Sequence, residues 1–437
     1  MRIAIIGNGI SGITAARTIR KRSNADIVVI SAETDYFFSR TALMYVYMGH
    51  LRFEDTQPYE PWFWEKNRIE LLRNWVDRVD FANKSIQFAT GKMAYDKLIL
   101  ATGSKSNRFG WPGQDLRRVS GLYSYQDLEK MESYSHDLRH AVIVGGGLIG
   151  IEMAEMFRSR GIGVTFLVRE AGYWDMVLPP EESAMVGRHI REHGIDLRLN
   201  AELREIVDDG QGRACAVITN SGERIDCQYV GLTAGVSPNV DFLREAGLEI
   251  GKGILVNEFL ETNIPDVYAV GDCAQLREPR PGRKPIEAVW YTGRMMGEAV
   301  AWTLTGRRTA YDPGIWFNSA KFLDIEYQVY GEVPVKLADG QAALYWEHPD
   351  GKRSIRLVYE QAGGAVIGFN LMGVRFRHEV CDRWIRTKTP VEEVLQNLGA
   401  ANFDPEFYGQ FESELVKDYN SRTGKRVELK KRRGMRN

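Results

Sequence analysis

Two glycine-rich segments in this chain have the residue types and the spacing needed to hold a dinucleotide. The first is Gly7-Asn8-Gly9-Ile10-Ser11-Gly12, and the second is Gly145-Gly146-Gly147-Leu148-Ile149-Gly150. Each reads G-x-G-x-x-G after an apolar run, which places backbone N–H groups of a helix start beside a pyrophosphate. A single match arises easily by chance, whereas two predict two dinucleotide sites. A chain needs two when a nicotinamide reduces a bound flavin.

The elements around the first segment predict a nucleotide-binding βαβ unit. Residues 3–6 read as a buried parallel strand, and a helix is expected to follow the glycines to residue 20. A second strand is expected over residues 26–30. Glu33 follows it, at about the 20-residue spacing of an acid that binds the adenosine ribose. The alternative for Glu33 is a solvated loop carboxylate.

The second segment is flanked by a strand over residues 140–144 and a helix over 149–160, with a further strand over 164–168. Arg169 follows that strand, where an arginine can pair with the 2′-phosphate of NADPH. The sequence therefore favours NADPH over NADH at this site, although Arg169 could also be a surface cation. Gly235, in the turn after residue 232, is expected to close the nicotinamide site.

Composition limits the function classes. A chain of 437 residues with 44% hydrophobic and 26% charged residues suits two or three globular domains. The net charge of −1 gives no general attraction to nucleic acid, and no apolar run reaches the roughly 18 residues of a membrane span. A strand starting at the N-terminus leaves no room for a signal peptide, so we expect a cytoplasmic protein. The four cysteines are scattered and the seven histidines show no metal spacing, so no metal is expected.

Two further segments carry a family resemblance. Residues 95–104 end in Ala101-Thr102-Gly103-Ser104, and residues 262–272 end in Gly271-Asp272. Together with the two fingerprints they resemble the pyridine nucleotide–disulfide oxidoreductase superfamily over residues 1 to about 400. The resemblance implies bound FAD, with Asp272 accepting a hydrogen bond from its ribityl chain. It also puts Val76 and Trp290 in the cofactor site.

The resemblance implies an α/β fold with two Rossmann-like domains and a C-terminal α+β interface domain. We expect the FAD-binding domain over residues 1–112 and 245–315, the NAD(P)-binding domain over 113–244, and the interface domain over 316–437. Strands over 327–330, 341–346, 354–359 and 365–371, then helices over 376–386 and 390–398, fit the last domain. This domain would mediate a homodimer, and its basic tail could dock an acidic partner or remain solvated.

The departures from the superfamily are informative. Thr41 stands where relatives with a single redox cysteine carry the thiol, and residues 402–406 lack the C-terminal histidine of other thiol-using members. Electrons are therefore expected to leave the flavin directly. Ferredoxin- and rubredoxin-type reductases and nitrite reductase flavin domains are more similar, and they imply that Arg40 lies near the FAD pyrophosphate.

One further departure concerns the flavin N5. In those relatives a lysine pairs with the glutamate that corresponds to Glu152, whereas this chain has Tyr45 at the lysine position. We expect Glu152 and Tyr45 beside the flavin. Tyr45 hydrogen-bonds Glu152, another cation does so, or the site is tuned differently.

The resemblance thus implies an FAD-dependent NAD(P)H oxidoreductase. Hydride would pass from NAD(P)H to flavin N5, and electrons would then pass to a small redox protein such as a ferredoxin or rubredoxin. Two alternatives stay open at this point. One is a dehydrogenase that uses a quinone at the membrane, and the other is a flavin-switched interaction protein that resembles apoptosis-inducing factor.

Overall fold

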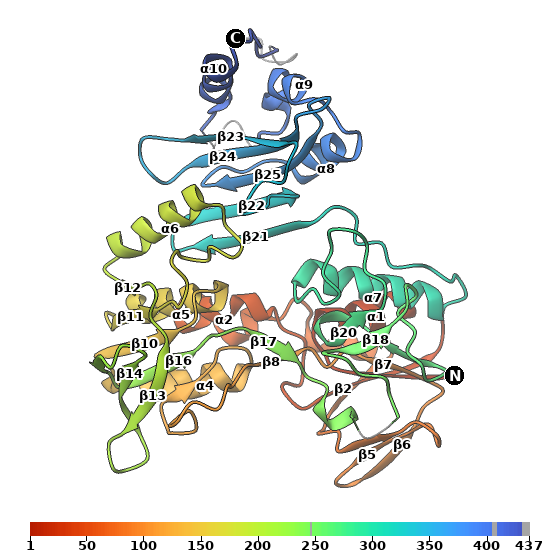
Figure 1. Cartoon of the computed structure of the whole chain (residues 1–437). Helices are drawn as coiled ribbons and strands as arrows, with labels where there is room; N and C mark the ends of the chain where they lie inside the picture. Colours follow the sequence, from red (N-terminus) through yellow and green to blue (C-terminus); the bar gives the residue numbers. More distant parts are fainter. Residues whose placement is uncertain (245–246, 404–408, 431–437) are drawn as a thin grey trace.

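The computed structural model describes residues 1–244, 247–403 and 409–430 and is built around three five-stranded sheets (Figure 1). The first two sheets are parallel and lie side by side, and the third is antiparallel and lies above them in the view of Figure 1. The predicted fold class, two Rossmann-like units followed by an α+β unit, is confirmed. The predicted domain boundaries stay predictions.

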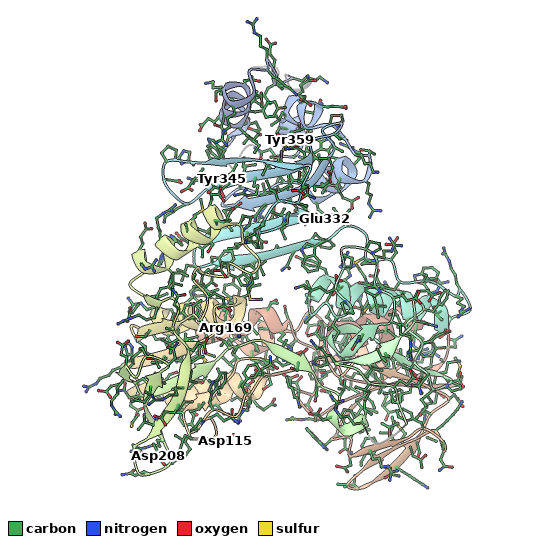
Figure 2. The ribbon with its side chains drawn as sticks, in the orientation of Figure 1. Asp115, Arg169, Asp208, Glu332, Tyr345 and Tyr359 are labelled. Atoms are coloured by element: carbon green, nitrogen blue, oxygen red, sulfur yellow. The ribbon has the colours of Figure 1, made fainter. Side chains whose placement is uncertain are left out.

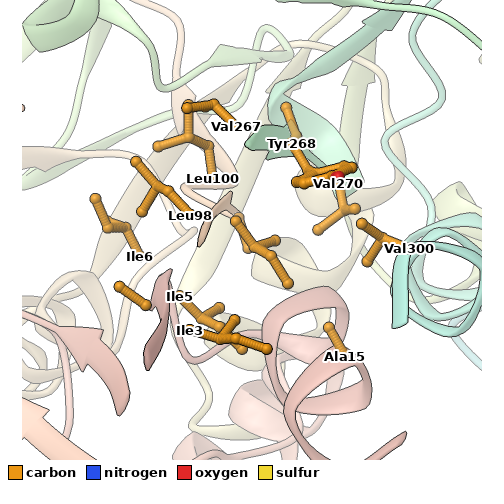
Figure 3. Close-up of a cluster of buried hydrophobic side chains, with 14 of the residues drawn as sticks. Ile3, Ile5, Ile6, Ala15, Leu98, Leu100, Val267, Tyr268, Val270 and Val300 are labelled. Carbon is orange, nitrogen blue, oxygen red and sulfur yellow. The ribbon is translucent and has the colours of Figure 1, made fainter. Parts of the chain in front are cut away.

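The first sheet combines strands from distant parts of the chain. Its parallel strands, in spatial order, are β19 (Val267–Ala269), β7 (Lys97–Leu100), β1 (Arg2–Ile6), β2 (Asp26–Ser31) and β3 (Ile69–Arg73). Helices α1 (Ile10–Arg20) and α7 (Trp290–Leu304) pack against each other on one face. Ile5, Leu98, Val267 and Val300 belong to one apolar core that extends over both faces of this sheet, because strands covered on both faces carry continuous hydrophobic runs (Figure 3).

The second sheet repeats the same plan. Its parallel strands, in spatial order, are β12 (Asp196–Arg198), β11 (Gly163–Leu167), β10 (His140–Val144), β16 (Tyr229–Leu232) and β9 (Val119–Ser120). Its helices are α4 (Tyr125–Tyr134), α5 (Leu148–Ser159) and α6 (Pro180–Glu192). A meander of β13 (Leu203–Asp208), β14 (Ala214–Thr219) and β15 (Arg224–Asp226) lies beside it. The predicted strands and helix around the second fingerprint are therefore present.

The third sheet has the antiparallel order β21 (Phe317–Phe322), β22 (Ile325–Gly331), β25 (Val366–Met372), β24 (Ser354–Glu360) and β23 (Gln341–Glu347). Helices α8 (His378–Arg386), α9 (Val391–Gln396) and α10 (Glu412–Thr423) follow it. The four strands and two helices predicted for this region are confirmed to within two residues at most boundaries. In the basic tail, Lys431, Arg432, Arg433 and Arg436 lie outside the described residues.

Shorter elements complete the description. They are α2 (Leu43–Tyr47), α3 (Pro61–Lys66), β4 (Arg78–Asp80), β5 (Ser85–Phe88), β6 (Gly91–Ala94), β8 (Ser104–Ser106), β17 (Val236–Pro238), β18 (Ile254–Val256) and β20 (Ala274–Leu276). Strands β8 and β17 pair with each other where the chain passes between the first two units. None of the helices in the described ranges is long and apolar enough to cross a membrane.

Ion pairs, one of them buried, join the third sheet to the second unit. The guanidinium of Arg356 on β24 donates to the carboxylate of Glu182, which is fully buried on α6, at 2.7 Å, and the same guanidinium contacts Glu181. Lys321 on β21 also bonds Glu155 of α5 through its Nζ at 2.7 Å. The C-terminal unit is therefore held against the helices that flank the second fingerprint.

Candidate functional site

One cavity of about 1650 Å³ runs between the first two units and reaches the C-terminal sheet. Ordinary small-molecule sites occupy about 300–1,000 Å³, so this cavity suits a ligand as large as a dinucleotide. Sixteen of the residues predicted from the sequence line it: Gly7, Gly9, Ile10, Ser11, Glu33, Arg40, Tyr45, Val76, Ala101, Thr102, Gly103, Leu148, Ile149, Glu152, Asp272 and Trp290. The remaining predicted residues are Gly12, Gly145, Gly147, Gly150, Arg169, Gly235 and Gly271, which are not part of its lining.

The first fingerprint has the geometry of a pyrophosphate cradle. Gly7 has a φ of +115°, and a Cβ there would lie 2.0 Å from the carbonyl oxygen of Ala101. Gly12 allows close packing, because its Cβ would lie 2.1 Å from the oxygen of Gly7. Gly9 caps α1 without a side-chain hydrogen bond and has open space around its Cα. The first N–H groups of α1 are thus available to an anion.

Glu33 and Arg40 lie together at the cavity wall. Both nitrogens of the Arg40 guanidinium fork donate to the Glu33 carboxylate, at 2.8 and 2.7 Å, and Tyr125 donates its backbone N–H to the same carboxylate. Burial lowers the pKa of Arg40, but the Glu33 carboxylate more than offsets it. Glu33 is thus no free loop carboxylate, and its role as ribose ligand stays a prediction, as does pyrophosphate binding by Arg40.

Asp272 lies in the short turn Gly271–Cys273 between β19 and β20. Its carboxylate accepts hydrogen bonds from Ser104 at 3.0 Å and from the Tyr123 hydroxyl at 3.4 Å. Burial raises the pKa of Asp272, and these donors together with Arg40 oppose that rise. Gly271, with a φ of +76°, packs on Ser11 just behind the cavity wall. Sequence reasoning missed Tyr123, which no local motif marks, and did not assign a role to Ser104, which ends the motif of residues 95–104.

Glu152 faces the cavity from α5, and its cationic neighbour comes from another unit. Within the described part of the chain, no hydrogen bond joins Tyr45 to Glu152. Lys321 of β21 lies with its Nζ 2.7 Å from Glu155, one turn further along α5, and 5.7 Å from the centre of the Tyr45 ring. Of the three alternatives, the structure favours another cation. That cation is Lys321, which sequence reasoning missed.

Burial and the neighbouring Glu155 raise the pKa of Glu152 to about 7, and Lys321 opposes the rise. The Glu152 side chain is partly exposed and belongs to the lining of the cavity. Its carboxyl is therefore poised to change charge near neutral pH at the wall that the resemblance places beside flavin N5.

The second fingerprint repeats the contacts of the first. Gly145 has a φ of +114°, and a Cβ on Gly150 would lie 2.3 Å from the oxygen of Gly145. Gly147 caps α5 without a side-chain hydrogen bond and has open space around it. Gly235, with a φ of +85°, lies in the turn before β17. The N-terminus of α5 is therefore a second anion site, consistent with a nicotinamide dinucleotide.

Arg169, labelled in Figure 2, follows β11 and is not part of the lining of the main cavity. Its side chain is 66% exposed, and its Nε donates to the neighbouring Glu170 carboxylate at 2.6 Å. The positive charge that would attract a 2′-phosphate is therefore partly neutralised.

The expectation that no metal is bound stays a prediction, but the structure brings three side chains with metal-binding groups together. His189 on α6 and His193, which caps the end of that helix, are four residues apart, and Asp324 approaches them from the turn between β21 and β22. Two ligands on one helical face are visible in the sequence, whereas the third comes from another unit and is not.

Comparisons with known proteins agree with this geometry. The family model described as pyridine nucleotide-disulphide oxidoreductase matches residues 1–297. The NADH oxidase of Methanocaldococcus jannaschii is 29% identical over 398 residues, which cover 85% of this chain and 88% of that protein. The ferredoxin–NAD(+) reductase component of the biphenyl dioxygenase system of Paraburkholderia xenovorans is 31% identical over 307 residues, 68% of this chain and 73% of that one.

Solved structures show the same architecture. A ferredoxin reductase from Rhodopseudomonas palustris superposes with a TM-score of 0.77 at 25% identity, over 85% of this chain and 91% of its own. An NAD-dependent persulfide reductase from A. fulgidus has a TM-score of 0.84 at 22% identity, over 97% of this chain and 84% of its own, and shows the fold alone. The chain belongs to the pyridine nucleotide–disulphide oxidoreductase family and is an FAD-dependent NAD(P)H oxidoreductase.

Proposed function

We propose that this chain passes electrons from NAD(P)H, through FAD, directly to a small redox protein such as a ferredoxin or rubredoxin. The observation that carries the proposal is the absence of a usable thiol at the cavity. Thr41 lines the wall where a single redox cysteine would be expected, and a threonine hydroxyl cannot cycle between thiol and disulfide. All four cysteines are among the described residues, and none lines the cavity.

Three of the four thiols are also chemically unsuited to the task. Cys227, Cys273 and Cys381 are buried, and burial raises the pKa of each thiol, that of Cys227 to about 12. A redox thiol needs a lowered pKa and access to its partner. Electrons that reach the cavity must therefore leave it without a protein disulfide.

The residues of the cavity fit FAD, and each would hold a different part of it. When bound, FAD accepts a hydride at N5 and can release one or two electrons. The N-terminus of α1 would hold the pyrophosphate, and Asp272, already oriented by Ser104 and Tyr123, would accept from the ribityl chain. Leu148 and Ile149, on the opposite wall, would position the nicotinamide against the flavin.

We further infer a small preference for NADPH, because Arg169 follows β11 and no acid stands at that strand end. Glu170 already accepts a hydrogen bond from Arg169, so the preference is expected to be modest. Several similar relatives are named for NAD(+) or NADH instead. Steady-state kinetics of Arg169→Ala would decide: we expect KM to rise for NADPH only. A rise of equal size for NADH, or no change, would contradict this role.

The acceptor is tested by reducing the FAD-loaded protein with NADPH without oxygen and then mixing it rapidly with four acceptors. These are a rubredoxin, a [2Fe–2S] ferredoxin, a water-soluble benzoquinone and dioxygen. We expect reoxidation by at least one redox protein at about 1 s⁻¹ or faster, within the ordinary range of enzyme turnover. Thr41→Val is the matched control and should leave this rate unchanged.

Other outcomes would replace the proposal. Fast reoxidation by dioxygen alone would indicate an oxidase, the activity for which the Methanocaldococcus relative is named. Fast reoxidation by the quinone alone would favour a quinone reductase. A long-lived reduced protein that no acceptor oxidises, together with a change in oligomeric state, would favour an interaction protein.

A further inference from the structure

Three side chains with metal-binding groups converge where the second unit meets the C-terminal sheet. His189 lies in the last turn of α6 and His193 caps the end of that helix, and Asp324 lies in the turn between β21 and β22, beside which α6 packs (Figure 1). One ligand atom of each residue lies within 4.8 Å of the other two. No part of the mechanism above uses these residues.

The ring nitrogens are oriented as in a metal site. Nδ1 of His193 lies 3.0 Å from the carbonyl oxygen of His189, so that nitrogen carries the proton and Nε2 presents its lone pair. Nε2 of His193 lies 3.5 Å from Oδ1 of Asp324. Metal-bound histidines characteristically donate their second N–H to a carbonyl or carboxylate, which fixes the ring.

His189 approaches the same carboxylate from a buried position. Its side chain is 1% exposed, and its Nε2 contacts the same Oδ1 of Asp324. Its Nδ1 is buried without a hydrogen-bond partner, and the nearest carboxylate, that of Glu192, lies 3.5 Å away. Two imidazoles therefore direct Nε2 at one carboxylate oxygen, and each has a carbonyl or carboxylate near its other nitrogen.

We propose that His189, His193 and Asp324 bind one Zn²⁺ ion that joins the nucleotide-binding unit to the C-terminal unit. Two imidazoles and a carboxylate suit zinc, whereas Mg²⁺ and Ca²⁺ prefer oxygen ligands. Bonds of about 2.0–2.2 Å place tetrahedral ligand atoms about 3.3 Å apart, so small side-chain rotations complete the site. The side chains of His193 and Asp324 are 35% and 54% exposed, which leaves room for water as the fourth ligand.

The surrounding charges orient the carboxylate. Lys352 lies with its Nζ 3.0 Å from Oδ2 of Asp324, which leaves Oδ1 for the metal. Asp324 lies three residues after Lys321 along the chain. Lys321 lies on the strand that ends at this turn and pairs with Glu155. A metal bound here would therefore hold the end of that strand in place, and with it the Lys321 ammonium group beside the cavity wall.

The test uses the FAD-loaded full chain, stripped with a chelator, dialysed, and titrated with Zn²⁺ in competition with a colorimetric zinc chelator. We expect one Zn²⁺ per FAD and a higher Tm in its presence. His193 is partly exposed at the end of α6, so His193→Gln should fold and keep its FAD. Its Zn²⁺ affinity should fall more than about 100-fold, which exceeds the effect of losing an outer partner of a ligand.

His348→Gln is the matched control. His348 also lies beside a carboxylate, that of Asp350 at 3.0 Å, but this pair is not part of the three-ligand group. Its loss should change neither stoichiometry nor affinity. The proposal is overturned if the FAD-loaded wild type takes up no Zn²⁺. It is also overturned if His193→Gln and Asp324→Asn both bind Zn²⁺ as tightly as the wild type.

Discussion

Replacing Glu152 by glutamine should remove a one-proton transition near neutral pH from this enzyme. The carboxyl faces the flavin cavity, where burial and Glu155 raise its pKa to about 7 from an ordinary value of 4.5. At pH 7 it is therefore about half ionised, whereas a solvent-exposed glutamate would be fully ionised. Glutamine has nearly the same shape and stays neutral at every pH.

The magnitude follows from the linkage between proton binding and folding. Between the unfolded pKa of 4.5 and the folded pKa of about 7, the folded chain holds a proton that the unfolded chain has released. The stabilising contribution of this proton is fully present below the lower value and is lost as the pH rises through the upper one. The rise in the pKa of Glu152 corresponds to at most about 3 kcal/mol of folding free energy, because water in the cavity screens part of the effect.

The assay compares the free energy of unfolding of FAD-loaded wild type and Glu152→Gln from about pH 4.5 to about pH 8.5. The stability of the variant relative to wild type should increase with pH by up to about 3 kcal/mol, with the change accumulating between about pH 4.5 and about pH 7 and levelling off above that. Stopped-flow flavin reduction by NAD(P)H should show the same transition in wild type only. A stability difference that is independent of pH, or a kinetic transition that persists in the variant, would refute the reasoning.

Three further perturbations test the contacts around this site. Lys321→Met should move the Glu152 transition above pH 7, because Lys321 lowers the pKa of Glu152. Lys321→Arg should largely preserve the transition. An unchanged pH profile of flavin reduction in the methionine variant would exclude Lys321 as the cation. Gly12→Ala places a Cβ 2.1 Å from the Gly7 oxygen and should reduce the FAD content of the purified protein to below about a tenth, read from its flavin absorbance; full FAD content would show that α1 can shift. Arg356→Met leaves two carboxylates of α6 without their cation, one of them fully buried, and should lower the free energy of unfolding in urea by about 3–5 kcal/mol. A loss below about 1 kcal/mol would mean that the buried carboxyl becomes protonated at little cost.

The sequence could predict those parts of the molecule that depend on local pattern. Strand, glycine turn and helix follow one another within about 30 residues at each fingerprint, so both nucleotide folds were predictable. The strands of the C-terminal sheet were also predictable from their residue types and the turns between them. Gly7 and Gly12 have the close approaches that their positions in the motif require.

The missing parts are contacts between residues far apart in the chain. Lys321 reaches Glu155 across 166 positions, and Tyr123 reaches Asp272 across 149. No periodicity encodes such contacts, because they arise only when separate sheets pack together. The relatives' lysine is absent at Tyr45, and Lys321 of the C-terminal unit supplies the cation instead. A motif comparison confined to residues 40–45 could not reveal this.

The central claim, that electrons leave the flavin without a protein thiol, is tested most directly by an anaerobic reductive titration of the FAD-loaded protein. Flavin absorbance at about 450 nm is followed while NADPH or NADH is added in known amounts. The structure predicts that one equivalent per FAD bleaches the absorbance completely, since no cysteine lines the cavity. A requirement for two equivalents would reveal a second two-electron centre and contradict the account.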